Sequence, residues 1–103
     1  MLCCKNNKLT SLPILNEKLE ILYCGNNQLT LLPVLPEKLK ELICDNNKLV
    51  SLPVLNYNLI KLKCCYNKLT SLPILHLWTF KPPTLFFALI FSCFIFKYTA
   101  FLL

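Results

Sequence analysis

The chain has 103 residues, and 55% of them are apolar, so it is long enough for one compact unit with a tail and too short for two ordinary domains. Its formal net charge is +6, and all eleven of its basic residues are lysines. These lysines are spread along the chain, whereas nucleic-acid readers usually concentrate Lys and Arg on one face. The composition therefore argues against a nucleic-acid partner.

The first three quarters of the chain repeat with a period of twenty residues, which is the feature to establish before secondary structure. A cysteine opens each unit, and leucine, asparagine and proline recur at fixed offsets behind it. Such columns predict a solenoid, in which each unit packs only against its neighbours. The defining columns are Cys4, Cys24, Cys44 and Cys64; Asn7, Asn27, Asn47 and Asn67; Leu9, Leu29, Leu49 and Leu69; Leu12, Leu32, Leu52 and Leu72; Pro13, Pro33, Pro53 and Pro73; and Leu15, Leu35, Leu55 and Leu75.

Each unit predicts one short strand, such as Leu22 to Cys24, with alternate side chains facing the core. The asparagine that follows each strand is expected to satisfy backbone groups that the turn leaves unpaired. Leu-Pro on the opposite side fixes φ and removes a donor, which favours an extended return segment over a helix. We therefore predict a mainly β solenoid over residues 1–76, with about four units, the first of them truncated.

The columns match the pattern L-x-x-L-x-L-x-x-N-x-L-x-x-L-P, with Cys at the third apolar position, as the stretch from Leu39 to Pro53 illustrates. In this the chain resembles the leucine-rich-repeat family over residues 2–75. The unit length, with the Leu-Pro-x-Leu-Pro motif at 32–36, is similar to the short repeats of bacterial effectors and of large amoeba-infecting viruses. The resemblance implies a short parallel sheet on the concave face and a role in binding proteins.

Side chains that project from the strands form the predicted binding surface, since a sheet presents them there as a regular array. Tyr23 and Tyr66 are expected to be its anchors, because tyrosine offers a large area at low entropy cost. An alternative is that both tyrosines merely cover the sheet. The candidate protein-binding residues of the concave face are Tyr23, Ile43, Asp45, Lys63 and Tyr66.

No residue pattern predicts catalysis, a metal or a cofactor. His76 is the single histidine, no motif places a Ser or Asp beside it, and a lone Gly25 cannot make a Gly-rich phosphate loop. Cysteines stacked along a line do not converge on a tetrahedron, and buried cysteine acts as a small apolar residue. Cys3 and Cys65 are expected to face outward, where oxidation or metal binding remains an alternative. The chain is thus predicted not to be an enzyme.

The repeat pattern stops at a junction over residues 77–83, where Pro82 and Pro83 forbid a regular strand. Residues 84–103 form a hydrophobic tail, which carries no charge before Lys97. Three explanations compete for this tail: a transmembrane helix, a hydrophobic cap over the last repeat, or the end of a truncated gene. The transmembrane explanation predicts a helical conformation for this tail.

Taken together, these patterns predict a non-enzymatic protein–protein interaction module, with membrane contact through residues 84–103 as an option. The alternatives are a metal- or redox-responsive cysteine protein and a truncated repeat fragment without function. Seven cysteines are an odd number, and no secretory segment precedes the repeats, so an intracellular, cytoplasmic location is expected. Membrane anchoring by the tail is the alternative location.

Overall fold

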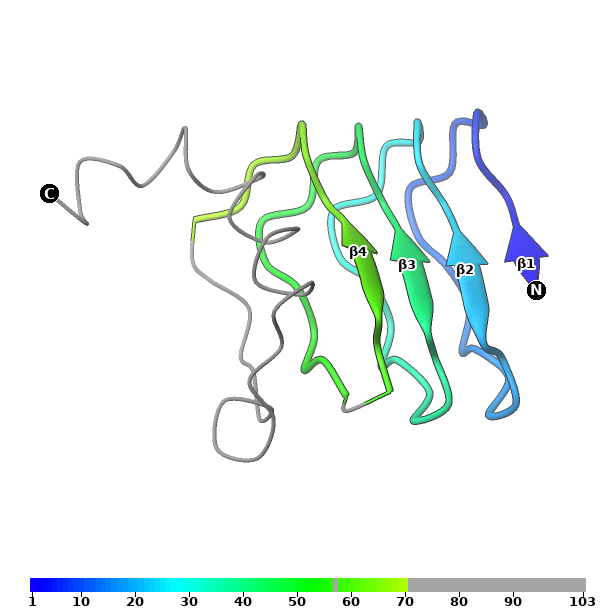
Figure 1. Ribbon diagram of the computed structural model, residues 1–103. Coiled ribbons are helices and arrows are strands. Elements are labelled where there is room, and N and C mark those ends of the chain that lie inside the picture. The colour runs from blue at the N-terminus through cyan, green and yellow to red at the C-terminus, as the bar shows by residue number, and fades with distance from the viewer. Residues whose placement is uncertain (57, 71–103) are drawn as a thin grey trace, which may run out of the picture.

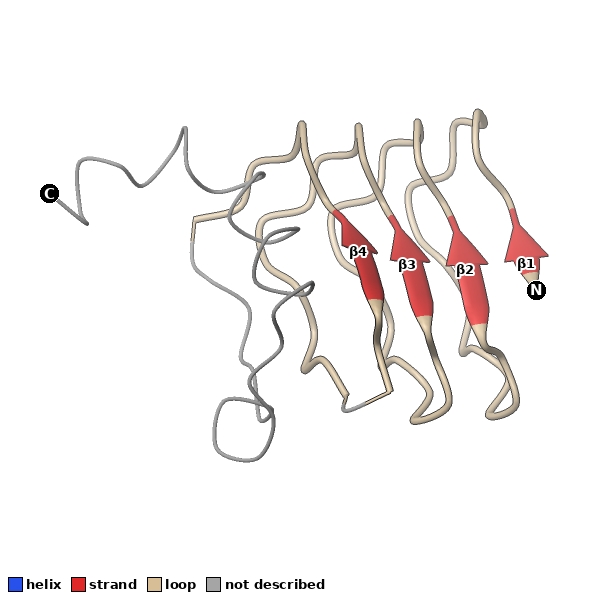
Figure 2. Cartoon of the chain, in the orientation of Figure 1, coloured by secondary structure: helices blue, strands red, loops and turns tan. Residues whose placement is uncertain are grey.

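The computed structural model describes residues 1–56 and 58–70, which wind into a solenoid with one strand in each turn (Figure 1). The strands form a single parallel sheet in the order β1-β2-β3-β4. No helix occurs within the described residues, and loops make up the rest of each turn (Figure 2). The predicted mainly β solenoid with a short parallel sheet is confirmed. The strands are β1 Leu2–Cys3, β2 Ile21–Tyr23, β3 Glu41–Ile43 and β4 Lys61–Lys63.

The twenty-residue period of the sequence is the register of the sheet. Leu22 pairs with Leu42, which in turn pairs with Leu62. In β2 and β3 the middle leucine is buried and the two flanking residues are partly exposed, as period-two alternation requires. Each of these strands begins and ends one residue earlier than predicted, although the Cys24 N–H continues the ladder with a 2.8 Å bond to the Ile43 carbonyl.

The core is a stack of leucine and cysteine columns, as the repeat predicts. The counterparts of these residues in the first unit, such as Leu9 and Leu19, are only partly buried, because only one described unit packs against them. Burial of each side chain therefore depends on the unit beside it. The fully buried members are Leu22, Cys24, Leu29, Leu39, Leu42, Cys44, Leu49, Leu55 and Leu62.

An asparagine ladder ties successive turns together and confirms the role predicted for that column. The Oδ1 atom of Asn47 accepts a 3.1 Å bond from the Leu29 N–H of the preceding turn. Its Nδ2 atom donates to the carbonyls of Cys24 at 3.1 Å and Cys44 at 3.0 Å. Asn27 repeats this arrangement one unit earlier. Because the side chain bonds both its own turn and the previous one, it fixes the spacing of the stack.

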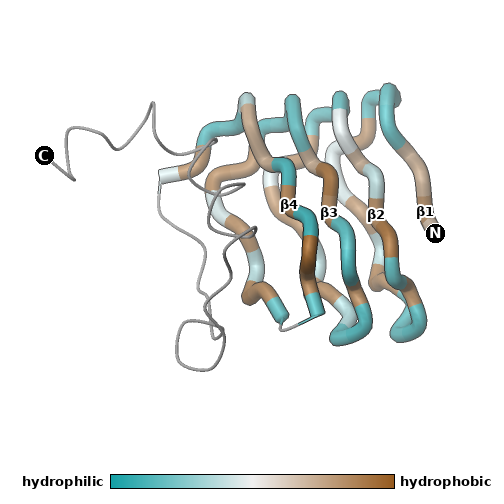
Figure 3. The backbone as a smooth tube through the Cα atoms, in the orientation of Figure 1, coloured by the Kyte–Doolittle hydropathy of each residue, from teal (hydrophilic) through white to brown (hydrophobic). Residues whose placement is uncertain are grey.

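Polar loops border the sheet at both ends of the strands (Figure 3). The loop before β2 is closed by an Asx turn, in which Asn16 Oδ1 accepts the Lys18 N–H at 2.8 Å. The return segments expose some apolar side chains, including Ile14 at 95% and Val34 at 86%.

Within residues 1–56 and 58–70, no helix is long and apolar enough to cross a membrane. The predicted end of the repeats at 76, the junction and the tail lie outside the described residues.

Candidate protein-binding face

The outward side chains of the strands, together with the residues two positions beyond them, make up the sheet face. The register places Tyr23 beside Ile43 and Ile43 beside Lys63. Two residues further on, the N–H of Asn26 bonds the carbonyl of Asp45 at 2.9 Å, so Gly25 lies next to Asp45. Residues distant in sequence are thus brought together solely by the stacking of units.

An open depression of about 360 Å³ lies on the sheet face. Four of the five candidate binding residues line it, namely Tyr23, Ile43, Asp45 and Lys63, and the fifth, Tyr66, does not. Gly25 contributes only backbone to the depression, because it has no side chain. The other lining residues are Lys5, Asn26, Asn46 and Lys61.

Tyr23 is held in place by its neighbour across the sheet. Its hydroxyl donates a 2.8 Å hydrogen bond to Glu41 Oε2, and this bond raises the pKa of Tyr23 above its ordinary value of 10.0. The tyrosine ring therefore keeps a defined position over β2 and β3. Such a fixed aromatic ring suits a binding surface, because little side-chain entropy is lost when a partner packs on it.

Glu41 and Lys61 belong to an outward column that the sequence-based reasoning missed. They occupy the first positions of β3 and β4, where Glu41 pairs with Lys61 on one side and with Ile21 of β2 on the other. The strands were placed one residue too late, so their first outward residue was overlooked. Period-two alternation counted backward from Tyr23 would have found this column.

The charged groups of the sheet face differ in how they are engaged. Asp45 Oδ1 accepts a 2.6 Å bond from the Cys65 N–H, and the Glu41 carboxylate accepts the bond from Tyr23. Within residues 1–56 and 58–70, the one ion pair joins Lys40 Nζ to Glu20 Oε1 at 3.3 Å, and neither residue lines the depression. Hence the carboxylates of this face are bonded internally, while its lysines have no acidic partner in the described part of the chain.

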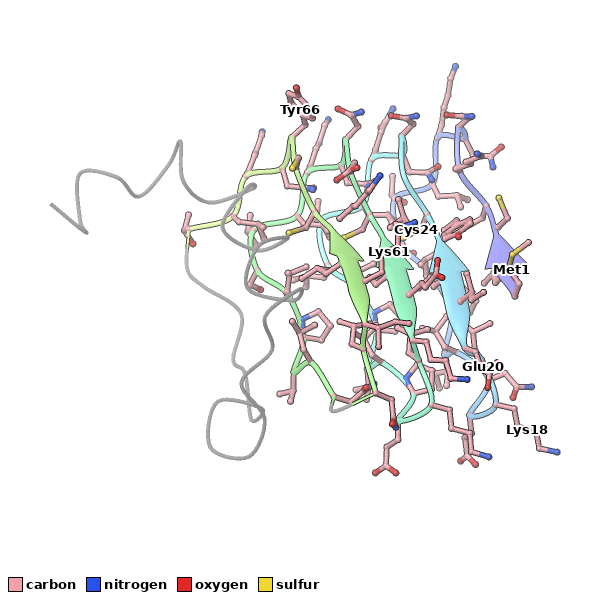
Figure 4. All side chains as sticks on the ribbon, viewed as in Figure 1. Met1, Lys18, Glu20, Cys24, Lys61 and Tyr66 are labelled. Atoms are coloured by element: carbon pink, nitrogen blue, oxygen red, sulfur yellow. The ribbon has the colours of Figure 1, made fainter. Side chains whose placement is uncertain are left out.

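Tyr66 lies on the ridge of loops that follow the strands, whereas Lys61 lies on the sheet (Figure 4). Its φ is 56°, in the left-handed region, and its side chain is 79% exposed. The other units have asparagine at this position, with φ between 55° and 62°. A tyrosine there costs roughly 1 kcal/mol of backbone energy that asparagine largely avoids. Its role as an anchor stays a prediction.

Three of the four thiols in the cysteine column are buried, and the first, Cys4, is partly exposed. Burial raises the pKa of Cys24 and of Cys64 to about 12, and it raises the pKa of Cys44 well above the ordinary value of 9.0. Cys3, by contrast, is exposed, as predicted. Within the described residues, no three His, Cys, Asp or Glu side chains gather where they could hold a metal ion. The buried thiols act as small core residues. His76 lies outside this part of the chain.

Comparison with solved structures gives the class of the protein. The leucine-rich-repeat domain of a Shigella effector superposes with a TM-score of 0.67 and 41% sequence identity, covering 68% of this chain. YopM from Yersinia enterocolitica superposes with a TM-score of 0.69 and 36% identity, covering 70% of this chain. With these matches, the register and the asparagine ladder, the chain is a leucine-rich-repeat protein.

More particularly, its repeats are similar to those of bacterial effectors. The chain spans 32% of the Shigella structure and 16% of YopM, so the likeness concerns the repeats and not the whole effectors. No protein-family model and no curated protein matches the chain.

Proposed function

We propose that the sheet face of this leucine-rich-repeat module binds a protein partner, and that the chain has no catalytic activity of its own. The depression on the sheet face carries this proposal, because it combines a fixed aromatic ring, an apolar side chain and charged groups on rigid strands. Binding sites are typically concave and carry a few well-placed polar groups. The likeness to effector repeat domains supports a role in protein interaction.

The depression alone is too small for a stable complex, so we expect the partner to cover the sheet face more widely. A specific interface buries about 800 Å² on each partner. Tyr23, Ile43 and Lys63 would then form its centre, and the flanking polar residues would form its rim. Tyr66, on the loop ridge, would reach the partner only if the interface extended past the ends of the strands.

A photo-crosslinking experiment tests the proposal in the full-length chain. One variant carries a photoreactive amino acid in place of Lys63, on the sheet face, and the control carries it in place of Ile14, on the return segment. Both side chains are exposed, so the substitutions disturb the core equally little. We expect a discrete crosslinked protein from position 63 and none of that mass from position 14. Equal products from both positions would contradict binding through the sheet face.

A further inference from the structure

We propose that the depression on the sheet face recognises a partner segment in which an acidic residue stands next to an apolar one. This inference rests on the proposed protein-binding role of the sheet face and specifies the chemistry of the partner. It follows from two features found together around Gly25. The lysines there have no acidic partner among the described residues, and the side chain of Ile43 and the ring of Tyr23 beside them are apolar.

The charge of the depression favours a carboxylate ligand. Among the residues that the structure describes, three lysines line it, namely Lys5, Lys61 and Lys63, against the single carboxylate of Asp45. Asp45 is already engaged by the N–H of Cys65, and none of the three ammonium groups meets an acid within residues 1–56 and 58–70. A carboxylate of the partner would supply the missing counter-charge. Its attraction would also speed the encounter of the two proteins.

The apolar part of the depression favours an apolar side chain next to the acidic residue of the partner. Ile43 and the ring of Tyr23 are neighbours in the sheet, and both are partly exposed. Gly25 leaves open backbone beside them, where the equivalent positions of the adjacent units carry Lys5 and Asp45. A side chain of the partner can therefore rest on Ile43 and Tyr23 while the adjoining carboxylate reaches Lys61 or Lys63.

The same arrangement disfavours a nucleic acid. A phosphodiester backbone carries a charge at every nucleotide and is bound by continuous basic grooves with stacking aromatic rings. On the sheet face, Glu41 and Asp45 interrupt the lysines and would repel successive phosphates. The hydroxyl of Tyr23 also donates a hydrogen bond to Glu41, which places a carboxylate beside the one aromatic ring that lines the described depression. Isolated carboxylates of a peptide match this alternating pattern better.

The test selects peptides from a random phage-displayed library with the full-length protein. Binding of a selected synthetic peptide is then compared between the unchanged protein, a K61Q/K63Q variant and a K8Q/K48Q control. The control removes the same charge from exposed lysines that do not line the depression. Circular dichroism melting of each variant verifies that the fold is retained. A single-stranded oligonucleotide serves as a competing ligand.

We expect the selected peptides to carry Asp or Glu beside an apolar or aromatic residue. K61Q/K63Q should weaken their binding by about tenfold, because it removes two exposed ion pairs with the partner, while K8Q/K48Q should change it by less than about twofold. Peptides without acidic residues, if crosslinked through position 63, would overturn this inference and leave the proposed function standing. Equal loss in both variants, or tighter binding of the oligonucleotide through the same two lysines, would also overturn it. Recovery of no peptide at all would overturn both proposals.

Discussion

Replacing Asn47 with alanine should be among the most damaging single changes in the described solenoid. The Leu29 N–H is fully buried, and the Asn47 side chain is its acceptor. An orphaned buried donor costs about 1–3 kcal/mol. The carbonyls of Cys24 and Cys44 each lose one donor but keep another, from Asn27 and Asn67 respectively, so their loss is smaller. The sum is about 2–4 kcal/mol.

The matched control is Asn7→Ala, at the equivalent position of the first unit. Asn7 is exposed and donates only within its own turn, to the carbonyls of Cys4 and Lys5. We expect its replacement to cost less than about 1 kcal/mol.

Urea unfolding of the full-length chain, followed by circular dichroism, measures both variants. With an m-value on the order of 1–2 kcal/mol/M, the midpoint for Asn47→Ala should fall by about 2 M. If this variant is unfolded without urea, trimethylamine oxide shifts its transition into the measurable range. The reasoning attributes the stabilisation to hydrogen bonds between turns, which Asn47 makes and Asn7 does not. Equal destabilisation by both substitutions would refute it.

Four further predictions concern the loop ridge, the thiols and the tail. Tyr66→Asn should raise the free energy of unfolding by up to about 1 kcal/mol, because asparagine tolerates positive φ, and Tyr66→Phe should not. Iodoacetamide at pH 8 should modify the exposed Cys3 and leave Cys24 unmodified until the protein is denatured. Because the pKa of Cys24 rises from 9.0 to about 12 on folding, the thiol contribution to stability is complete below pH 9 and is lost between about pH 9 and 12. If residues 84–103 anchor the chain, the full-length protein should sediment with membranes, and a version ending at Leu75 should stay in the supernatant.

Each of these predictions has a clear contrary result. Equal melting temperatures for the Asn and Phe variants at position 66 would show that the backbone conformation there carries no cost. Alkylation of Cys24 at the rate of Cys3 in the native protein would contradict its burial. A stability that is constant between pH 9 and 12 would contradict the raised pKa of the buried thiol. Recovery of both versions in the supernatant would exclude the membrane anchor.

Much of the fold was predictable because the repeat makes each core position visible several times. The leucine columns are buried, and the asparagine column bonds successive turns, as expected. The strand boundaries were one residue off, since alternation alone does not say which hydrogen bonds begin a strand. Positive φ at Asn46 and Tyr66 was not foreseen either, because it depends on how the chain leaves the strand.

The candidate site was less predictable than the core. Tyr23, Ile43, Asp45 and Lys63 share a depression because the period makes them neighbours. The hydrogen bond from Tyr23 to Glu41 depends on side-chain conformation, which the repeat does not encode. Which charges of the sheet face are bonded internally likewise depends on side-chain conformation in the folded chain.

Alternation along the strands separates the inward residues, which form the core, from the outward residues, which form the sheet face. Leu22, Leu42 and Leu62 are the same in every strand, while the positions before them are Ile21, Glu41 and Lys61. A substitution on the outward side therefore leaves the leucine column of the core unchanged. The affinity for a partner can therefore change, by evolution or by design, through substitutions at single outward positions. The buried leucines that hold these positions in place need not change.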